Sequence, residues 1–364
     1  MHCEGGTLGR EDVLRLTARL AEQCRTTGPL RLMEVCGTHT MAIASSGLRS
    51  ILPPEIQLVS GPGCPVCVTP AGAIDAILGL SELAHVTVAS YGDLLRVPGS
   101  VRGDSLLRRR ALGARVQTVY SPIEALDLAE REPLRQVVFL GVGFETTAPG
   151  TAAAILEAQK RNIRNFSVLS LLKLTPPALQ TLVAAPDFAV NGFLCPGHVA
   201  AVIGSRAFAF LPETFGLPAV VAGFTPTDLL YAISRLVTLL AAGTPLLENG
   251  YTRLVRGEGN LAGLAGMERV FEPCDSHWRG MGTIPRSGLA LREEFAPWDA
   301  ARRFGFCPVQ ETQTHGCCCG EVIRGVLSPR ECPLFNRVCT PSDPVGPCMV
   351  SSEGACAAAS RYGG

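Results

Sequence analysis

Short apolar segments alternate with amphipathic helical patterns over most of the first 240 residues, and this alternation limits the fold more than any other feature. A loop rich in Gly, Pro or Thr usually separates an apolar segment from the helical pattern after it. Strands that alternate with helices of about ten to fifteen residues predict parallel sheets with right-handed crossovers. The apolar segments lie at residues 30–35, 56–59, 86–89, 117–120, 136–142, 166–171, 188–194 and 219–222. Helical patterns lie at 11–24, 71–83, 150–161 and 177–184, with others beginning near 41 and 122 and one ending near 240.

The number of these units allows either one closed barrel or two open sheets. A barrel needs about 250 residues of regular repeats, and the charged segment LDLAEREPLR near residue 130 resembles a joint between two units. We therefore predict an α/β fold with two open parallel-sheet domains, residues 1–130 and 131–244. From about residue 245 the alternation stops, and residues 245–364 are expected to form a loop-rich region organised by a metal centre.

Charge and hydropathy exclude several classes of protein. The chain has 32 basic and 32 acidic residues, and such a neutral chain is unsuited to non-specific nucleic-acid binding, which depends on neutralising phosphates. The most apolar stretch, residues 229–247, is interrupted by Arg235 and a Gly-Thr-Pro break, so no membrane span is expected. The first twelve residues do not have the pattern of a signal peptide. We expect a cytoplasmic protein.

Fifteen cysteines in 364 residues are too few for a disulfide scaffold of this length, and in a reducing compartment they indicate metal binding or thiol chemistry. Four of them near the C-terminus have the spacing C-x12-C-x6-C-x16-C, a set that suits a cubane iron–sulfur cluster or tetrahedral zinc. The paired CxxC knuckles of structural zinc sites are missing here, which favours a [4Fe-4S] cluster over zinc or free core cysteines. These four are Cys319, Cys332, Cys339 and Cys356, with Cys307, Cys317, Cys318 and Cys348 close enough to substitute.

A CxxC motif, Cys64 and Cys67, lies in the tight loop GPGCPVC. We expect it at the start of a helix, where the helix N-terminus stabilises a thiolate. Two cysteines at this spacing can form a disulfide that stores and returns two electrons. Half of a zinc site and an inert pair of cysteines are the alternative interpretations.

Cys36 and His39 lie in CGTHT, directly after an apolar segment. A thiol and an imidazole in a strand-to-helix turn can both point into one cleft. They are candidates for a Cys/His catalytic pair or for transition-metal ligands, and an inert core cysteine is the alternative.

Two further loops carry candidate polar residues. Glu145 of GFETTAP is either an ordinary capping residue or a proton relay at an anion-binding helix N-terminus. His198 of CPGH is a candidate ligand or proton donor, or a structural histidine. Because sites in open parallel sheets form beyond the carboxyl ends of strands, we expect these strand-following loops to line one or two clefts.

Together these strings resemble the HypD family of hydrogenase maturation factors. The matching stretches are MEVCGTHTMAI, SGPGCPVCVTP, GDLLRVPGS, GFETTAP, CPGHVAAVIG and the cysteine-spaced tail from Cys319, in order along nearly the whole chain. The run Cys317-Cys318-Cys319 makes the first tail position ambiguous, and the spacing selects Cys319. Thr225 stands where the family pattern suggests an acidic residue.

The resemblance implies a fold of two α/β domains with a cluster region, and a scaffold that works with the small chaperone HypC. On it an iron centre with two cyanides and one carbonyl, Fe(CN)2CO, is assembled; HypE donates the cyanide, and the large subunit of a [NiFe] hydrogenase receives the product. The resemblance also implies that Cys36 binds this iron, that Cys64 and Cys67 perform thiol redox chemistry, and that the four tail cysteines hold a [4Fe-4S] cluster.

We therefore expect a redox-active assembly scaffold rather than a conventional turnover enzyme. His39 and His198 would supply hydrogen bonds or protons in the cleft. A cluster-dependent protein disulfide reductase, which needs the CxxC but not Cys36, is one alternative. A zinc-stabilised binding protein is another.

Overall fold

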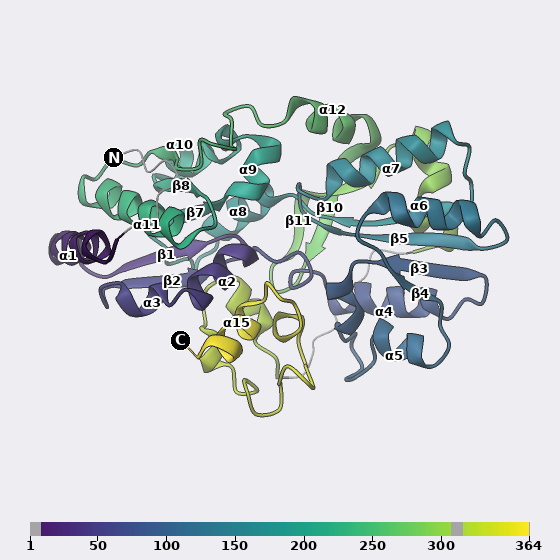
Figure 1. Cartoon of the computed structure of the whole chain (residues 1–364), viewed down its shortest axis with the longest axis horizontal. Helices are drawn as coiled ribbons and strands as arrows, with labels where there is room; N and C mark the ends of the chain where they lie inside the picture. Colours follow the sequence, from purple (N-terminus) through teal and green to yellow (C-terminus); the bar gives the residue numbers. More distant parts are fainter. Residues whose placement is uncertain (1–8, 307–315, 364) are drawn as a thin grey trace.

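Two parallel β-sheets form the two lobes of the molecule (Figure 1). The computed structural model describes residues 9–306 and 316–363; Cys307, one of the alternative metal ligands, lies outside the described residues. The observed α/β class with parallel sheets agrees with the prediction from the sequence.

The first sheet, sheet A, has five parallel strands in the order β2-β1-β7-β8-β9. In strand β1, Leu30 and Leu32 face the core beneath α1 and α11, whereas Met33 and Val35 belong to the core on the other face. This alternation is the period of two that a strand imposes. The strands are β1 (Leu30–Glu34), β2 (Ile56–Ser60), β7 (Gly192–Pro196), β8 (Ala219–Ala222) and β9 (Leu247–Asn249).

The second sheet, sheet B, has four parallel strands in the order β4-β3-β5-β6. Its central strand β5 pairs with β3 on one side and with β6 on the other. Phe139 faces one core and Leu140 faces the other. The strands are β3 (Val86–Ser90), β4 (Val116–Thr118), β5 (Gln136–Gly143) and β6 (Phe166–Leu172).

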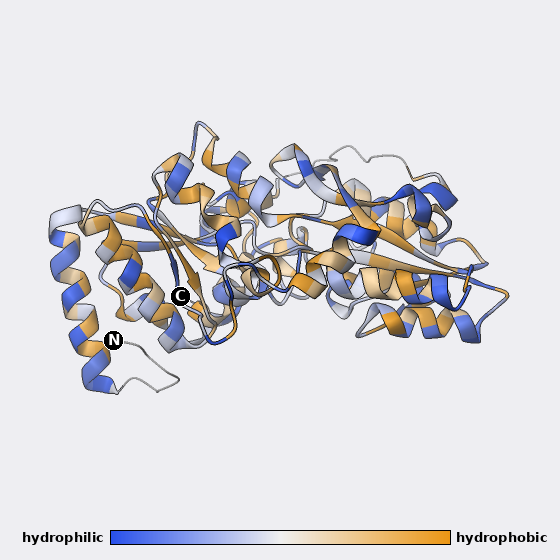
Figure 2. Cartoon of the chain, turned by 90° about the horizontal axis from the view of Figure 1, so that it is seen from above, coloured by the Kyte–Doolittle hydropathy of each residue, from blue (hydrophilic) through white to orange (hydrophobic). Residues whose placement is uncertain are grey.

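Helices cover the faces of both sheets, so apolar strands lie inside and polar helix faces point outward (Figure 2). The helix α1 (Arg10–Thr27) packs with α11 (Pro226–Ala241) on sheet A. A capping box of Thr225 and Asp228 starts α11, with Pro226 at its first position. On sheet B, α4 (Ala71–Ser81) and α5 (Leu106–Ala111) cover one face, and α6 (Pro122–Arg131) and α7 (Ala148–Lys160) cover the other.

The remaining helices are short. The α-helices are α2 (Gly37–Ser45), α3 (Leu48–Ile51), α8 (Thr175–Val183), α9 (Gly197–Ile203), α10 (Phe210–Phe215), α12 (Leu261–Val270), α13 (Ala300–Phe304), α14 (Cys319–Ile323) and α15 (Ala355–Tyr362). The 3-10 helices are η1 (Gly92–Arg96), η2 (Ser205–Phe208), η3 (Glu293–Trp298), η4 (Pro329–Glu331) and η5 (Pro347–Met349).

The expectation that the sheets divide near residue 130 is wrong. Strands on both sides of that residue, β3 and β5, pair in sheet B, whereas β1 pairs with β7 in sheet A. The chain thus crosses from sheet A to sheet B after β2 and returns after β6. The charged segment near residue 130 is the outer face of α6, where Asp127 and Glu130 pair with Arg161. A solvated helix face and a joint between domains look alike in sequence.

The region after residue 245 contains more regular structure than we predicted. Strand β9 completes sheet A, and an antiparallel hairpin of β10 (Phe271–Trp278) and β11 (Gly282–Leu291) packs against β6 and α8. Pro273 and Pro285 weaken the strand pattern in sequence. The loop-rich part begins only near residue 316. Its helix α15 packs against α2 (Figure 1).

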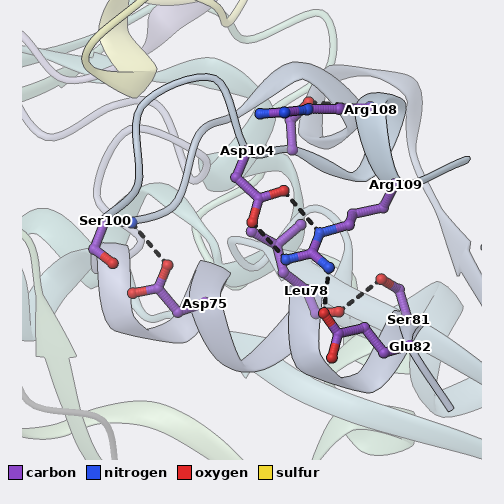
Figure 3. Close-up of polar contacts among 9 residues, drawn as sticks. Asp75, Leu78, Ser81, Glu82, Ser100, Asp104, Arg108 and Arg109 are labelled. Atoms are coloured by element: carbon purple, nitrogen blue, oxygen red, sulfur yellow. Dashed lines mark hydrogen bonds and ion pairs between the residues drawn. The ribbon is translucent and has the colours of Figure 1, made fainter. Parts of the chain in front are cut away.

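Ion pairs and hydrogen bonds tie the loop between η1 and α5 to α4 (Figure 3). Ser100 N donates to Asp75 Oδ1 at 2.7 Å. Arg109 donates to the two carboxylate oxygens of Asp104 at 2.8 and 2.7 Å and also contacts Glu82, which follows the last residue of α4. The hydrogen bonds from Arg109 lower the pKa of Asp104. None of the helices in the described ranges combines the length and hydropathy that a membrane span requires.

The core of sheet B provides a test of this architecture. Phe139 is 0% exposed on β5, so Phe139→Ala should lower the free energy of unfolding by about 3–5 kcal/mol. Leu134, which is 96% exposed just before β5, is the matched control. Leu134→Ala should change the free energy of unfolding by less than about 0.5 kcal/mol. Urea titrations of both variants measure the difference. Equal effects would contradict the burial described here.

Candidate thiol and metal site

The loops after β1 and β2 lie in direct contact at the carboxyl edge of sheet A. Gly37 N donates to Gly63 O at 3.0 Å, and Gly61 N donates to Glu34 O at 2.8 Å. A Cβ on Gly63 would lie 2.3 Å from Cys36 N, so only glycine allows this approach. The structure therefore brings the CGTHT and CxxC loops together, as expected for loops that follow neighbouring parallel strands.

Cys64 and Cys67 form a disulfide with a Cα–Cα distance of 5.2 Å. Both residues are buried, and Ser351 Oγ lies 3.3 Å from Cys64 Sγ. The pair does not begin a helix, in contrast to our expectation. It occupies a turn in which Val68 N donates to Cys64 O, and α4 starts only at Ala71. Pro70 lies between this turn and α4, and the turn does not continue into it.

The Cys36 thiol lies at the N-terminus of α2. Burial raises its pKa to about 11, although hydrogen bonds from the His39 and Thr38 backbone lower it. The Glu353 carboxylate raises this pKa further. Thr38 Oγ1 donates to Glu353 Oε1 at 2.7 Å, so the C-terminal region closes over the CGTHT turn.

Glu34 is a functional candidate that the sequence analysis did not identify. Its side chain is 0% exposed and accepts hydrogen bonds from Thr40 Oγ1 at 3.1 Å and Ser60 Oγ at 2.7 Å. Arg49 Nη2 lies 3.7 Å away, and burial raises the Glu34 pKa despite these partners. One carboxylate thus joins the CGTHT helix to the end of β2. The only signal in sequence is an acidic residue inside an apolar strand.

His39 and His198 belong to one aromatic cluster around Phe224. His39 Nε2 lies 3.3 Å from Ala222 O and 3.1 Å from Gly223 O, so Nε2 carries the proton. Burial lowers the His39 pKa to about 4, which keeps the ring neutral. His198 is exposed and stacks on Phe224 with ring centroids 3.7 Å apart. His39 approaches Cys36 through its backbone, and its ring points to the end of β8.

Glu145 lies at the carboxyl edge of sheet B, and its hydrogen bonds stay within that lobe. Its two carboxylate oxygens accept from Thr175 N at 2.7 Å and Thr175 Oγ1 at 2.8 Å, at the N-terminus of α8. Burial raises its pKa to about 7. Glu145 therefore ties β5 to α8 and does not cap its own helix α7. The hydrogen bonds of the described residues do not connect it to Cys36.

Six tail cysteines line one small pocket, and Cys348 links it to a second pocket that holds the disulfide. Cys317 Sγ and Cys319 Sγ lie 3.2 Å apart. Cys348 hydrogen-bonds with Cys319 and also lines a second pocket that contains Cys64 and Cys67. The six are Cys317, Cys318, Cys319, Cys332, Cys339 and Cys356. All four predicted cluster ligands are thus brought together, and Cys348, which the sequence analysis named as a possible substitute ligand, lies between the two pockets.

The donor set in this pocket suits a metal–sulfur group. Burial and neighbouring thiols raise the pKa of Cys356, and a hydrogen bond with Cys319 raises the pKa of Cys317. Crowded thiols of this kind lose their protons when a metal binds. Across residues 9–306 and 316–363, no three His, Cys, Asp or Glu side chains are already arranged as a metal site.

The fold and this site define an α/β protein with three neighbouring thiol features. They are the free Cys36 thiol, the Cys64–Cys67 disulfide and the cysteine-lined pocket. The chain matches the family described as "HypD: Hydrogenase formation hypA family" over residues 11–363. It is 46% identical over 355 residues to hydrogenase expression/formation protein HupD of Azotobacter chroococcum mcd 1, covering 96% of this chain and 93% of that protein. It is 47% identical over 355 residues to hydrogenase maturation factor HypD of Azotobacter vinelandii, with the same coverage of 96% and 93%. Against HypD of Escherichia coli (strain K12) the identity is 42% over 360 residues, covering 97% and 95%. The chain belongs to the HypD family of hydrogenase maturation factors, and the resemblance is confirmed.

Glu145 provides a pH-dependent test of the buried contact between the end of β5 and α8. Its folded pKa of about 7 lies above the ordinary 4.5, so its contribution to stability is complete below pH 4.5 and is lost as the pH rises through 7. The loss is at most about 3 kcal/mol. Glu145→Gln should therefore gain stability relative to the wild type between pH 5 and pH 8, as measured by urea unfolding. The exposed Glu130→Gln is the control, and an equal pH response in both variants would contradict the burial of Glu145.

Proposed function

We propose that this protein is a scaffold that, with the chaperone HypC, binds iron and assembles the Fe(CN)2CO unit of a [NiFe] hydrogenase. Membership of the HypD family supports the general role in hydrogenase maturation. The contact between the Cys36 loop and the Cys64–Cys67 turn supports the specific role, because a cysteine able to bind iron lies beside a two-electron store.

Iron is the cargo of this scaffold, and Cys36 is its proposed anchor. A thiolate completes the coordination of low-spin Fe(II) without displacing strong-field cyanide or carbonyl ligands. A second thiolate comes from HypC, HypE donates the cyanide, and the finished unit passes to the large subunit of the hydrogenase. The neutral His39 ring holds the end of β8 beside the Cys36 turn. The exposed His198 is available to donate hydrogen bonds or protons.

Cys64 and Cys67 supply reducing equivalents in this proposal. The disulfide takes up two electrons and one proton to give one thiol and one thiolate. Reoxidation restores the S–S bond and returns both electrons and the proton to the iron unit at Cys36. The electrons originate from an external one-electron donor. Cys348 lines the disulfide pocket and contacts Cys319 of the cysteine-lined pocket. This arrangement supports electron transfer to the disulfide from the cysteine-lined pocket.

The tail cysteines are the proposed ligands of a [4Fe-4S] cluster, Cys319, Cys332, Cys339 and Cys356. When bound, such a cluster transfers single electrons, which suits a stepwise reduction of the neighbouring disulfide. An all-sulfur, buried donor set supports this assignment over zinc with mixed ligands. Cys317 and Cys318 line the same pocket and remain alternatives for the first ligand, especially because Cys319 also contacts Cys348.

Burial argues against the rival function of a protein disulfide reductase. Such an enzyme must present its attacking sulfur to a substrate protein. Cys64 is 6% exposed and Cys67 is 2% exposed, and Ser351 lies against Cys64. The rival function also predicts activity that is independent of Cys36, whereas the scaffold requires it.

Cys36→Ala is the direct test of iron binding. The variant should lose the iron-bound cyanide and carbonyl infrared bands of the complex with HypC, while the visible absorption of the cluster is unchanged, because Cys36 does not line the cluster pocket. Cys24→Ala removes another buried free cysteine, in α1, and should keep both signals. Normal hydrogenase maturation with Cys36→Ala would refute the proposed anchor.

Serine variants of the tail cysteines test the cluster. Cys332→Ser, Cys339→Ser and Cys356→Ser should each reduce iron and sulfide per chain after anaerobic reconstitution, because each removes a thiolate from one pocket. Of Cys317, Cys318 and Cys319, only the true ligand should have the same effect. A colourless wild-type protein with stoichiometric zinc would overturn the assignment.

A further inference from the structure

A buried arginine lies between the disulfide turn and the cysteine-lined pocket. Arg279 is 4% exposed and occupies the tip of the β10–β11 hairpin. Among the ion pairs of the described residues, none joins its guanidinium to a carboxylate. Burying a guanidinium without an anionic partner is costly, because it loses hydration. Such a charge indicates a role toward groups that are negative only in another state of the protein.

Arg279 is fixed to the disulfide turn by three hydrogen bonds. Its Nε and Nη2 donate to Thr69 O at 3.0 and 2.9 Å. Its backbone N donates to Val68 O at 2.8 Å. Val68 and Thr69 directly follow Cys67, so the guanidinium is held at the carbonyl end of the CxxC turn.

The same hairpin tip is packed against the cysteine segment. Gly280 has a φ of +73°, and a Cβ there would lie 2.2 Å from Gly320 Cα, next to Cys319. The hairpin tip therefore contacts both the disulfide turn and the segment that carries Cys319.

The neighbouring Trp278 holds the hairpin tip rigidly. Its side chain is 0% exposed, and its Nε1 donates to Ser287 Oγ at 2.8 Å. Its ring stacks on Phe144, with centroids 5.9 Å apart. The position of Arg279 is thus determined by the core between the lobes, and a preorganised charge needs no rearrangement when the thiols are reduced.

We propose that Arg279 is a positioning residue whose fixed positive charge stabilises the reduced, anionic form of the Cys64–Cys67 pair. This inference rests on the proposed redox function of those cysteines. Reduction of the disulfide by two electrons and one proton yields one thiol and one thiolate. A cation held nearby favours that product over the neutral disulfide, so it raises the reduction potential.

The experiment compares three variants as cluster-free protein, equilibrated in dithiothreitol redox buffers. Alkylation and peptide mapping report the oxidised fraction of Cys64–Cys67 alone. Arg279→Met should make the disulfide harder to reduce by about tenfold in the equilibrium constant, which is ~30 mV for a two-electron couple. Arg279→Lys keeps the charge but not the forked geometry, so it should recover part of this shift.

Arg303→Met is the matched control. Arg303 is half-buried, donates to Arg164 O at 2.9 Å and lies in α13 against sheet B, away from the disulfide. Its replacement should leave the Cys64–Cys67 equilibrium within twofold of the wild type. Circular dichroism tests whether each variant is folded. If Arg279→Met does not fold, the shift measured with Arg279→Lys decides the test.

The outcomes separate this inference from the function on which it rests. A reversible wild-type couple that is unchanged in both Arg279 variants would overturn the role of Arg279 and leave the redox function intact. A wild-type disulfide that does not equilibrate with dithiothreitol would refute the redox function itself, and this inference with it. An equal shift in Arg279→Met and Arg279→Lys would show that geometry, and not charge, controls the couple.

Discussion

The contact between Gly63 and the backbone of Cys36 is the constraint on which the rest of the site depends. The hydrogen bond from Gly37 N to Gly63 O draws the two loops together at the edge of sheet A. Any side chain at residue 63 would collide with Cys36 N. Because β1 and β2 are adjacent and parallel, both loops leave the sheet at one edge, and the thiol and the disulfide become neighbours.

Buried polar groups then fix these loops at considerable electrostatic cost. Glu34 accepts hydrogen bonds from both loops without access to water. Arg279 holds the end of the disulfide turn from the side of the hairpin. A buried charge with several hydrogen-bond partners orders its surroundings, because any displacement leaves it unpaired. Both groups therefore favour a rigid site over a mobile one.

Much of the fold could be predicted from the sequence, because burial imposes local periods. The apolar segments at β1, β2, β3, β5 and β6 appear at nearly their predicted positions, and each site loop follows its strand. The division near residue 130 could not be predicted, because a solvated helix such as α6 carries the same charges as a linker. The β10–β11 hairpin was missed because its prolines and exposed face obscure the strand pattern.

The sequence by itself determined the α/β class and the family, and it singled out the candidate cysteines, because these depend on local spacing and residue type. Only the tertiary structure decided that the chain enters sheet B and returns to sheet A, since strand pairing joins residues distant in sequence. Tertiary structure also decided which groups face the thiols. Glu34 and Arg279 belong to no local motif, and sequence spacing alone does not place Cys348 between the two pockets. The surroundings of all three arise from burial and from contacts between residues distant in sequence.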